Sequence, residues 1–588
     1  MRYALAVQTR FQRLAAIGLI SLAFLHNTLI GWRKWGDLLI DCGKEWDVAA
    51  QLAGGQRLYV DNRYYYGPLT PYVNALLFRC FGIHVDVLMY AGLVVVAAMC
   101  VVMYRLSRCF LDRAPAALVT VGFLYLFALS QMYPGGICNY VLPYSPAASY
   151  GSLLSIACLY FLIKYARKLQ PKYIWLASLF LALAGLTKME LFFAAAVAHA
   201  ALFVGLWWTG VLRWRTHVLA VAAGLAAMGC VYAVVIHSVT WPVFADNVFG
   251  LFGPSYQQYS AELAGLLDLR HSLKMVAGSS AILLGAIVIA LAAAFLARGS
   301  AERRDVRLGL FAAGLVIGGL AYKFCPINMA TNCLPLLLAG GLLTVLVMAW
   351  KNPKRRAALL PFALLHVFAL ACLFRIALNC TIYGFPQFFL LPPALVVFAL
   401  LWFVYLPDFN RLKLGAGLPF VSRGVGTGAL LTLCALQLSY SSRAFELRTT
   451  LIDFPRARMF VTTGTKQFPA GEMTGSLNDW LCGLPRDARV LVLPYGVGFT
   501  FVAGLKTPYR LHSYLPTDLT GNYAEALVLE EWKANPPDYI LRIPTPDNPA
   551  LDGFGTRYGL LMRNWIQNNF EPLGAIGPDH YYLILKHK

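Results

Sequence analysis

Long apolar runs separated by short polar gaps occupy the chain from residue 13 to residue 441. Thirteen such runs can be counted. Most are about 18 to 25 residues long, which is the length that a helix needs to cross a bilayer. The pattern therefore predicts a polytopic α-helical membrane protein with about thirteen transmembrane helices. Basic residues precede the first run and no small-residue cleavage site follows it, so we expect this run to stay as an uncleaved anchor.

The basic residues lie in every other gap. Lys and Arg gather in the segments YRLSRCFLDR, KYARKLQPK, LRWRTH, ARGSAERRDVR and KNPKRR, whereas gaps such as YPGGICNYVLPYSP carry few or none. This alternation follows the positive-inside rule and predicts a cytoplasmic amino terminus and, after an odd number of spans, an outer carboxy terminus. The net charge of +21 mostly encodes orientation. Patches that read a phosphate backbone would not be divided among so many loops, so we expect no nucleic acid as a partner.

Three segments on the predicted outer side are too long to be simple connectors. Residues 32–86 form the first outer loop, residues 238–272 form the second, and the third is the tail. In the tail, the strand patterns RVLVLP, DYILRI and YYLILK alternate with the helical patterns ALVLEEWKA and YGLLMRNWIQNNF. Alternating strands and helices predict a small α/β domain. We therefore expect a membrane domain at 1–441 and an extracytoplasmic α/β domain at 442–588.

The segment DCGKEWDVAAQL, which begins at Asp41, places acids on the apolar side of a predicted helix. Asp41 and Glu45 share a face with the apolar residues that follow, whereas Lys44 and Asp47 lie on another face and are expected to form a solvated pair. A second helical pattern, TPYVNALLFRCFG, follows. Two amphipathic helices on an outer loop should lie flat on the membrane and hold Asp41, Glu45 and Asp61 just above the lipid headgroups.

Around these acids the sequence resembles a known family. The first outer loop contains the patterns D-x-G-x-E, G-x-x-L-Y-x-D, Y-Y-Y-G-P-L and F-x-x-F-G. Related segments follow in GLTKMELFFAA and FRIALNCTIYGFPQFFLLPP, and in the tail in LPYGVGFTFVAGLKTPYR and FGTRYGLLMRNWI. Together they resemble bacterial GT-C fold glycosyltransferases, in particular the glycosyltransferase family 39 group, which includes protein mannosyltransferases, and the aminoarabinose transferase-like proteins. The resemblance touches most of the chain.

The resemblance implies an enzyme, namely an inverting glycosyltransferase. Such enzymes move a single hexosyl or pentosyl sugar from a polyprenyl-phosphate donor to a lipid, glycan or protein acceptor, on the outer face of the bacterial cytoplasmic (inner) membrane. In the family, an acid at the position of Asp41 is the catalytic acid/base, and Glu45 or Asp61 would orient it or bind sugar hydroxyls. The chain departs from aminoarabinose transferases, which carry a Lys before a Pro-Pro-Leu turn, because it has YGPL beginning at Tyr66. The phosphate contact must come from elsewhere.

Residues at the outer ends of the apolar runs are candidates for that contact. A charge at membrane depth is costly and by default indicates function, and the fork geometry of Arg suits a phosphate. A structural ion pair, or a lysine that extends its side chain to the interface, explains these cations as well. Because Lys188 and Glu190 are two positions apart, each is expected to have a separate partner. The predicted residues for the carrier phosphate and sugar are Tyr66, Lys188, Glu190, Lys323, Arg375 and Tyr383.

No cofactor is firmly indicated. The Gly-rich GVGTG at 424–428 lacks the Lys of a nucleotide-binding loop and is expected to serve helix packing. The 13 cysteines form no CxxC pair and no Cys/His cluster, so no metal site is predicted. A divalent cation, Mg²⁺ or Mn²⁺, stays open as a cofactor held by the outer acids. A disulfide between Cys42 and Cys80 in the first outer loop also stays open.

Two other functions stay open. A ligase or polymerase that joins a whole oligosaccharide from a lipid diphosphate carrier would share the many spans and the large outer loops. A diphosphate, however, would favour more Arg at the outer surface than this sequence places there. A lipid-sugar transporter without chemistry is expected to have internal repeats with broken helices, and the sequence contains no such repeat.

Overall fold

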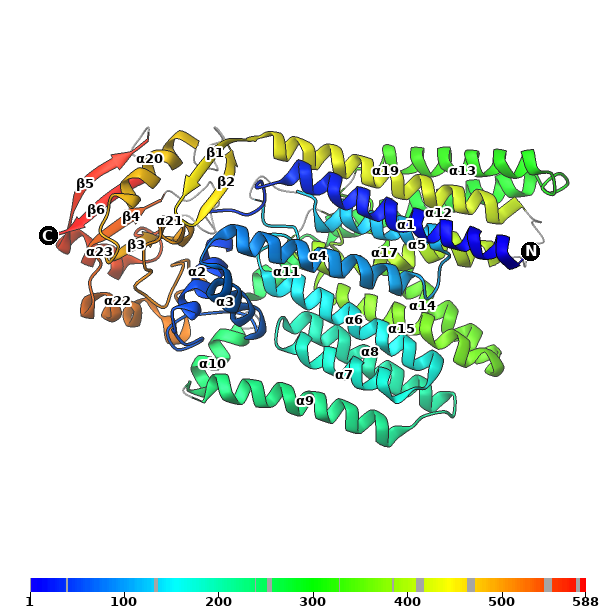
Figure 1. Cartoon of the computed structure of the whole chain (residues 1–588), viewed down its shortest axis with the longest axis horizontal. Coiled ribbons are helices and arrows are strands. Elements are labelled where there is room, and N and C mark those ends of the chain that lie inside the picture. The colour runs from blue at the N-terminus through cyan, green and yellow to red at the C-terminus, as the bar shows by residue number, and fades with distance from the viewer. Residues whose placement is uncertain are drawn as a thin grey trace.

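The molecule is elongated, with a helical bundle along its long axis and a smaller β-sheet part at one end (Figure 1). The amino terminus lies at the end of the bundle remote from the sheet, and the carboxy terminus lies at the tip of the sheet part. The computed structural model describes residues 2–38, 41–131, 136–237, 239–250, 256–326, 328–382, 385–408, 417–462, 471–543, 553–577 and 582–588.

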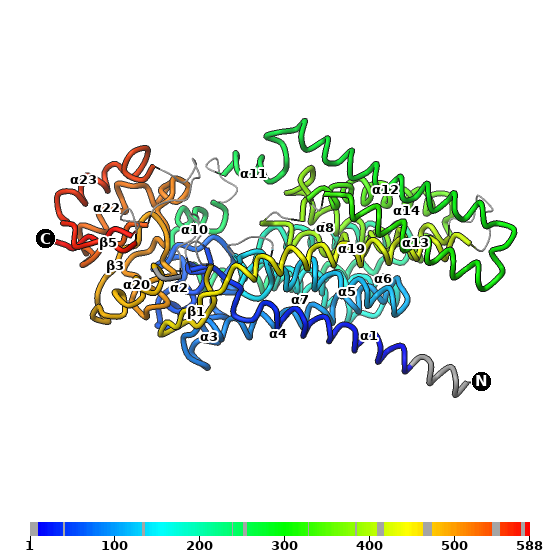
Figure 2. The backbone as a smooth tube through the Cα atoms, turned by 90° about the horizontal axis from the view of Figure 1, so that it is seen from above, coloured from blue at the N-terminus to red at the C-terminus, as the bar shows by residue number. Residues whose placement is uncertain are grey.

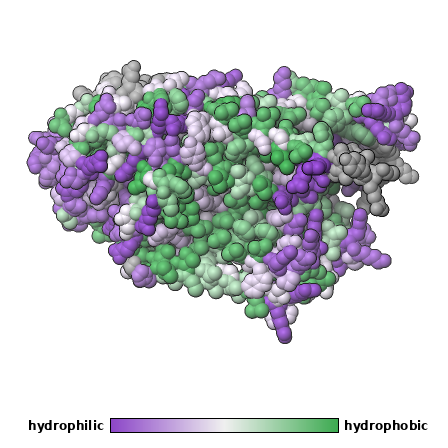
Figure 3. All heavy atoms as spheres, viewed as in Figure 1, coloured by the Kyte–Doolittle hydropathy of each residue, from purple (hydrophilic) through white to green (hydrophobic). Residues whose placement is uncertain are grey.

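The helices of the bundle account for the apolar runs. Within the described residues, ten helices are long and apolar enough to cross a membrane. Three further apolar helices, at Arg113–Ala128, Pro171–Gly185 and Pro392–Asp408, are shorter. Each of the thirteen predicted spans coincides with one of these helices, so the predicted polytopic α-helical fold is confirmed. On the face drawn in Figure 3, apolar surface covers the middle of the molecule and hydrophilic surface lies at both ends.

The elements of the bundle are α1 (Arg2–Gly31), α4 (Val85–Ser107), α5 (Arg113–Phe123), η1 (Leu124–Ala128), α6 (Pro146–Lys168), α7 (Pro171–Gly185), α8 (Met189–Trp208), α9 (Trp214–Ile236), α12 (Leu269–Leu296), α13 (Arg304–Lys323), α14 (Leu334–Lys351), η4 (Pro353–Arg355), α15 (Arg356–Leu373), η5 (Phe374–Ile376), α16 (Gln387–Leu390), α17 (Pro392–Leu400), η6 (Leu401–Tyr405), α18 (Leu406–Asp408) and α19 (Leu418–Glu446).

Glycines let two of these helices approach very closely. A Cβ atom added to Gly314 or Gly318 of α13 would lie 2.3 or 2.2 Å from a backbone oxygen of α19. In the opposite direction, a Cβ atom on Gly424 or Gly428 of α19 would lie 2.3 Å from a backbone oxygen of α13. Small residues allow such direct backbone packing between helices in a membrane. The packing role predicted for the GVGTG segment is confirmed.

The first outer loop folds into two helices, α2 (Asp41–Ala53) and α3 (Leu69–Phe81), at the junction between the bundle and the sheet part. On α3, the apolar side chains of Tyr72, Leu76 and Phe81 are exposed, as expected of a helix against lipid. The prediction for α2 is wrong in one respect, because nine of its 13 residues are buried and none of the others is fully exposed. It is therefore an enclosed helix and does not lie half-solvated on the membrane.

A helix of the tail, α21 (Val497–Ala503), covers α2. A Cβ atom on Gly43 would lie 2.4 Å from the Cα atom of Gly498, so the two backbones touch. Two aromatic side chains of the first outer loop, Trp46 and Phe78, pack against Phe501 of α21, with ring centroids 5.9 and 6.3 Å apart. These contacts hold the tail on the first outer loop.

The YGPL segment that departs from the family pattern packs on the turn between α7 and α8. The backbone N–H of Gly67 donates to the carbonyl of Thr187 at 2.7 Å, and that of Leu69 donates to the carbonyl of Leu186 at 2.9 Å. A Cβ atom on Gly67 would lie 2.4 Å from the backbone of Leu186, so the approach requires glycine. The segment is thereby fixed beside Lys188, which directly follows this turn.

The second outer loop contributes α10 (Trp241–Val248) and α11 (Gln257–Leu263). In the view from above, α10 lies beside α2 and the tail, and α11 lies between the tail and the outer end of α12 (Figure 2). The backbone N–H of Leu378, just after η5, donates to the carbonyl of Ala264 at 3.2 Å. The second outer loop is thus attached to both the tail and the bundle.

The tail contains a hairpin and a four-stranded sheet in the order β3-β4-β6-β5. Strands β3 and β4 are parallel, and the other neighbouring pairs are antiparallel. The predicted strands β3, β4 and β6 and the predicted helices α22 and α23 are confirmed, whereas the remaining tail elements were not predicted. The elements are β1 (Arg448–Phe454), β2 (Ala457–Thr462), α20 (Gly471–Cys482), β3 (Val490–Leu493), α21, η9 (Gly521–Tyr523), α22 (Glu525–Ala534), β4 (Tyr539–Arg542), α23 (Leu560–Asn569), β5 (Phe570–Ile576) and β6 (Tyr582–His587).

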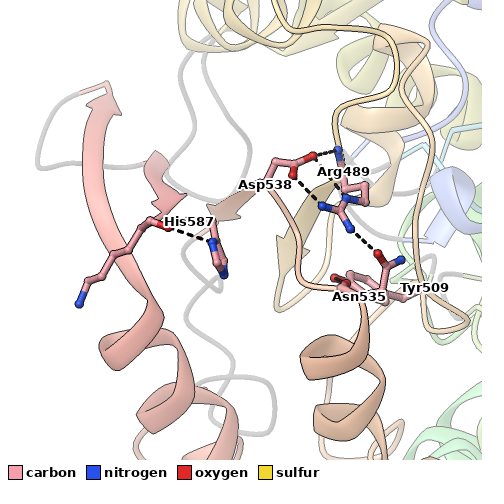
Figure 4. Close-up of polar contacts among 6 residues, drawn as sticks. Arg489, Tyr509, Asn535, Asp538 and His587 are labelled. Carbon is pink, nitrogen blue, oxygen red and sulfur yellow. Dashed lines mark hydrogen bonds and ion pairs between the residues drawn. The ribbon is translucent and has the colours of Figure 1, made fainter.

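Polar contacts fix the ends of three sheet strands (Figure 4). Arg489 precedes β3 and donates to both carboxylate oxygens of Asp538, from its backbone N–H at 2.9 Å and from Nη2 at 2.8 Å. The carbonyl of Asp538 accepts from the backbone N–H of His587 in β6 at 3.0 Å. Nearby, the hydroxyl of Tyr509 donates to the carbonyl of Asn535 at 2.7 Å. Arg489 and Asp538 are partly exposed, so this network lies at the surface of the sheet part.

The contact between Gly43 and Gly498 yields a prediction about stability. We expect Gly43→Ala to destabilise the protein by about 1–3 kcal/mol, because the added methyl group meets backbone atoms that cannot rotate away. The measurement is the thermal unfolding temperature of the purified protein in detergent. Gly475→Ala in α20 is the matched control, because a Cβ atom there has nothing within 4 Å and alanine favours a helix. Equal unfolding temperatures for wild type and Gly43→Ala would refute the close packing of α2 and α21.

Candidate active site

The three consecutive tyrosines of the first outer loop have different charged partners. The hydroxyl of Tyr64 donates to Oε2 of Glu45 at 3.0 Å. The ring of Tyr66 faces Lys188, whose Nζ lies 3.9 Å from the ring centroid. Tyr65, between them, bonds to the tail. All three tyrosines are buried. The loop therefore connects an acid of α2 with the cation that precedes α8.

Asp41 is the first residue of α2 and has a pKa close to neutral. Burial raises the pKa of Asp41 from its ordinary value to about 6. The charge of Lys44 lowers this pKa, whereas the charges of Asp37 and Asp518 raise it further. A carboxylate with this pKa is ionised at pH 7 and is basic enough to accept a proton in a reaction.

Glu45 lies one turn further along α2 and differs from Asp41 in its protonation state at pH 7. Burial raises the pKa of Glu45 to about 8, against the hydrogen bond from Tyr64 and the charges of Lys188 and Lys44, all of which lower it. Glu45 is therefore mostly protonated at pH 7. Neighbouring carboxyls whose environments separate their pKa values are typical of acid and base roles in one site.

Two cations share one carboxylate where α8 begins and α15 ends. Nζ of Lys188 lies 3.9 Å from Oε1 of Glu190, and Nη1 of Arg375 donates to the same oxygen. The expectation of separate partners for Lys188 and Glu190 is wrong, because Lys188 precedes the helix in an extended conformation and is not held to helical spacing. Burial lowers the pKa of Lys188 to about 8, although Glu190 raises it.

Aromatic rings surround the ammonium group of Lys188, which is 1% exposed. Besides Tyr66, its Nζ lies 5.4 Å from the ring centroid of Phe389 and 5.9 Å from that of Phe385. Cation–π contacts of this kind hold a desolvated cation in place. The predicted contact residue Tyr383 lies outside the described residues.

Two other predicted residues lie apart from these contacts. Lys323, at the carboxy end of α13, is exposed, and its Nζ lies 5.9 Å from the ring centroid of Phe324. Asp61 accepts from the backbone N–H of Arg57 at 2.8 Å and lies 3.5 Å from Nε of the same residue. Asp61 therefore stabilises a turn, and these contacts give no support to a catalytic role.

The predicted solvated pair of Lys44 and Asp47 is wrong. Asp47 is 2% exposed, and its Oδ2 lies 3.0 Å from Nε2 of His512 in the tail and accepts from Gln51 at 2.6 Å. Lys44 donates to the hydroxyl of Ser513 at 2.9 Å. Both side chains bind the tail, because α21 and the segment after it cover the side of α2 that the sequence pattern assigned to solvent.

Sequence reasoning missed the contributions of the tail and of α11. Asp518 lies in an ordinary polar turn of the sequence, YLPTDLTGNY, but is 3% exposed in the structure. The charges of Asp41 and Arg375 act on Tyr259 of α11, whose side chain is 39% exposed. The unusual length of the second outer loop was the available signal for Tyr259, and the sequence around Asp518 carried none.

The part of the chain that the structure describes contains neither a metal-binding cluster nor a disulfide. No group of three or more His, Cys, Asp or Glu residues there is placed to hold a metal ion. A divalent cation as cofactor stays a prediction. Cys42 is buried, Cys80 is exposed, and both are free thiols.

Comparisons with known proteins return similar structures only. No family model matches the chain, and no curated protein matches it. Among solved structures, the archaeal oligosaccharyltransferase AglB from Archaeoglobus fulgidus, in complex with an inhibitory peptide and a dolichol-phosphate, is similar with a TM-score of 0.49 and 13% identity over 91% of this chain and 70% of that one. ArnT from Cupriavidus metallidurans bound to undecaprenyl phosphate is similar with a TM-score of 0.44 and 11% identity over 97% of both chains. Its apo state has a TM-score of 0.39 and 14% identity over 97% of this chain and 98% of that one.

Proposed function

We propose that the protein transfers a single sugar from a polyprenyl-phosphate donor to an acceptor hydroxyl at the outer face of the cytoplasmic membrane. The observation that carries the proposal is the connection of α2, which carries Asp41 and Glu45, to a buried pair of cations through one short loop. Tyr64 of this loop donates to Glu45, and Tyr66 contacts Lys188. Lys188 precedes α8, and Arg375 follows α15 and donates to Glu190. The exposed apolar surface of the bundle fits a lipid carrier.

The charge of the cation group suits a phosphodiester. Lys188 and Arg375 together carry two positive charges, and Glu190 carries one negative charge, which leaves a net charge of +1 in a buried place. A sugar attached to a lipid phosphate is a monoanion, and negative charge accumulates on the phosphate as the sugar leaves. Fixed cations in a site with little water stabilise that developing charge.

The pKa values of Asp41 and Glu45 assign the two acids different roles. Asp41, with a pKa of about 6, is ionised at pH 7 and takes the proton from the acceptor hydroxyl. The acceptor oxygen then bonds to the anomeric carbon, the bond from that carbon to the phosphate oxygen breaks, and its electron pair leaves with the lipid phosphate. Glu45, with a pKa of about 8, carries a proton at pH 7 and is suited to donate a hydrogen bond to a sugar hydroxyl. A single in-line displacement inverts the anomeric configuration.

The same group argues against the rival functions. A lipid diphosphate donor would bring more negative charge than a net +1 neutralises, so a ligase or polymerase fits less well. A transporter has no need of a carboxyl whose pKa is moved toward neutrality beside the sugar site. The outer location and the cytoplasmic amino terminus are part of the proposal and rest on the distribution of basic loops.

Replacing Asp41 by Asn tests the proposed base. We expect Asp41→Asn to lower sugar transfer by about 10²–10⁴-fold, because an amide cannot take the proton. The measurement is mass spectrometry of the carrier after purified protein is incubated with lipid-linked sugars and an acceptor mixture. The proposal expects polyprenyl monophosphate from the wild type.

Asp61→Asn is the matched control, because it removes a carboxylate of the same loop whose partner among the described residues is Arg57 in its own turn, and we expect near wild-type release. Release of polyprenyl diphosphate would contradict the proposed function and support an oligosaccharide ligase or polymerase. Unchanged release by Asp41→Asn would remove Asp41 from the chemistry.

The pKa values also predict a bell-shaped pH dependence of kcat/KM. Activity should appear as the pH rises through about 6, where Asp41 loses its proton, and should fall as the pH rises through about 8, where Lys188 loses its charge. In Lys188→Arg the cation stays charged, so the alkaline limb should move to higher pH. In Glu45→Gln the alkaline limb should stay. If the alkaline limb moved in Glu45→Gln and stayed in Lys188→Arg, the limb would report the titration of Glu45, and the role of Lys188 would be contradicted.

A further inference from the structure

Asp518 is a tail residue whose carboxylate is bound inside the site. Its Oδ1 accepts from the hydroxyl of Tyr65, and its Oδ2 accepts from the hydroxyl of Ser513 at 2.5 Å and from the backbone N–H of Leu515 at 3.2 Å. The residue is 3% exposed. A carboxylate held by several donors in this way keeps a fixed position and stays ionised.

Cations of the first outer loop complete its surroundings. Nη1 of Arg63 donates to the backbone carbonyl of Asp518, and the guanidinium carbon lies 4.9 Å from the ring centroid of Tyr65. Lys44 reaches the same place through its hydrogen bond to Ser513. Burial raises the pKa of Asp518, but the charges of Lys44 and Arg63 and the hydrogen bonds bring it below its usual range.

The second outer loop ties the same parts together. Oδ1 of Asn247 accepts from the backbone N–H of Tyr64 at 2.8 Å, and its Nδ2 donates to the hydroxyl of Tyr523 at 2.9 Å. Asp246 accepts from the backbone N–H of Asn522 at 2.9 Å. The first outer loop, α10 and the tail therefore form one hydrogen-bonded unit around the tyrosines.

Asp41 is surrounded by groups from each element packed against it. Asp37 precedes it, Lys44 and Glu45 share its helix, Asp518 comes from the tail, and thiol and phenol groups come from elsewhere in the fold. Among the described residues, the titratable groups whose charges interact with Asp41 include Asp37, Cys42, Lys44, Glu45, Cys138, Tyr144, Tyr259 and Asp518. Asp518 belongs to the tail, and Lys44 is bonded to the tail through Ser513.

We propose that Asp518 is a positioning residue for Asp41, so that the tail completes the transferase site. Asp518 binds Ser513 and Tyr65, and both of these residues contact Lys44 in the first turn of α2. Asp518 thereby fixes this turn, and its negative charge adjusts the proton affinity of the base. This inference rests on the transferase function proposed above. It makes the tail a working part of the site.

The test uses two opposite charges around Asp41. The charge of Asp518 raises the pKa of Asp41, whereas the charge of Lys44 lowers it. We therefore expect the acidic limb of kcat/KM to move to lower pH in Asp518→Asn and to higher pH in Lys44→Gln. Asn keeps an oxygen that accepts from Tyr65, so the loop can stay docked. Asp518→Glu restores the charge and should return the limb toward its wild-type position.

Asp538→Asn is the matched control, because it removes a tail carboxylate that is bound by arginine at the surface of the sheet (Figure 4). It should leave the acidic limb in place. Shifts of the limb in opposite directions support the proposal, and a purely structural role would lower activity without moving the limb. Limbs that stay fixed, or that move in the same direction in Asp518→Asn and Lys44→Gln, overturn it. If Asp518→Asn fails to fold, Ser513→Ala decides, because it cuts the link between Asp518 and Lys44, and an unmoved acidic limb in that variant overturns the proposal.

An infrared titration separates this inference from the proposed function. The C=O band of a protonated carboxyl that Asp41→Asn removes reports the protonation of Asp41 without any turnover. If the midpoint pH of this band shifts in Asp518→Asn, the coupling between Asp518 and Asp41 is supported. If the midpoint is unchanged, the coupling is overturned. A wild type that releases no carrier overturns the transferase function, whatever the band does.

Discussion

Burial of charge where α8 begins and α15 ends is the constraint on which the rest of the structure depends. Lys188 is almost inaccessible to solvent, and Glu190 and Arg375 are largely buried beside it. Removing such groups from water costs several kcal/mol for each ion unless partners compensate. The shared carboxylate and the ring of Tyr66 provide that compensation. A group of charges this costly in a membrane protein indicates function.

The same constraint explains the construction of the first outer loop. Glycine at position 67 lets the loop backbone bind the turn before α8, which brings the tyrosines to the buried charges. Glycine at position 43 lets the tail pack on the other side of α2. Asp41 and Glu45 are therefore enclosed from two sides, and this enclosure raises their pKa values. The tail is thus needed for the electrostatics of the site.

Much of the fold follows from local sequence patterns. Apolar runs locate the bundle helices, GVGTG marks a close helix contact, and alternating patterns locate three strands and two helices of the tail. The strands β1, β2 and β5 and the helix α21 were not predicted because each has only six or seven residues. The 12-residue helix α20 was not predicted either. The acids of α2 and the cation before α8 were also visible as charges in apolar surroundings.

The partners of those charges could not be predicted from local patterns. Glu190 and Arg375 are 185 positions apart, and Tyr65 and Asp518 are 453 positions apart. The solvated pair predicted for Lys44 and Asp47 failed for the same reason, because the chain that covers that face comes from the tail. Helical spacing also misjudged Lys188, which lies just outside its helix. Long-range packing decides each of these cases.

We propose that Lys188 and Arg375 bind the phosphate of a polyprenyl carrier. The most direct measurement is the unfolding temperature of the purified protein with and without polyprenyl monophosphate. A carrier at 100 times its Kd should stabilise the wild type by about 2.7 kcal/mol. We expect Lys188→Gln to lose this stabilisation and Lys323→Gln, which alters an exposed lysine, to retain it. Equal stabilisation of Lys188→Gln, or equal stabilisation of the wild type by the polyprenol without phosphate, would contradict the claim.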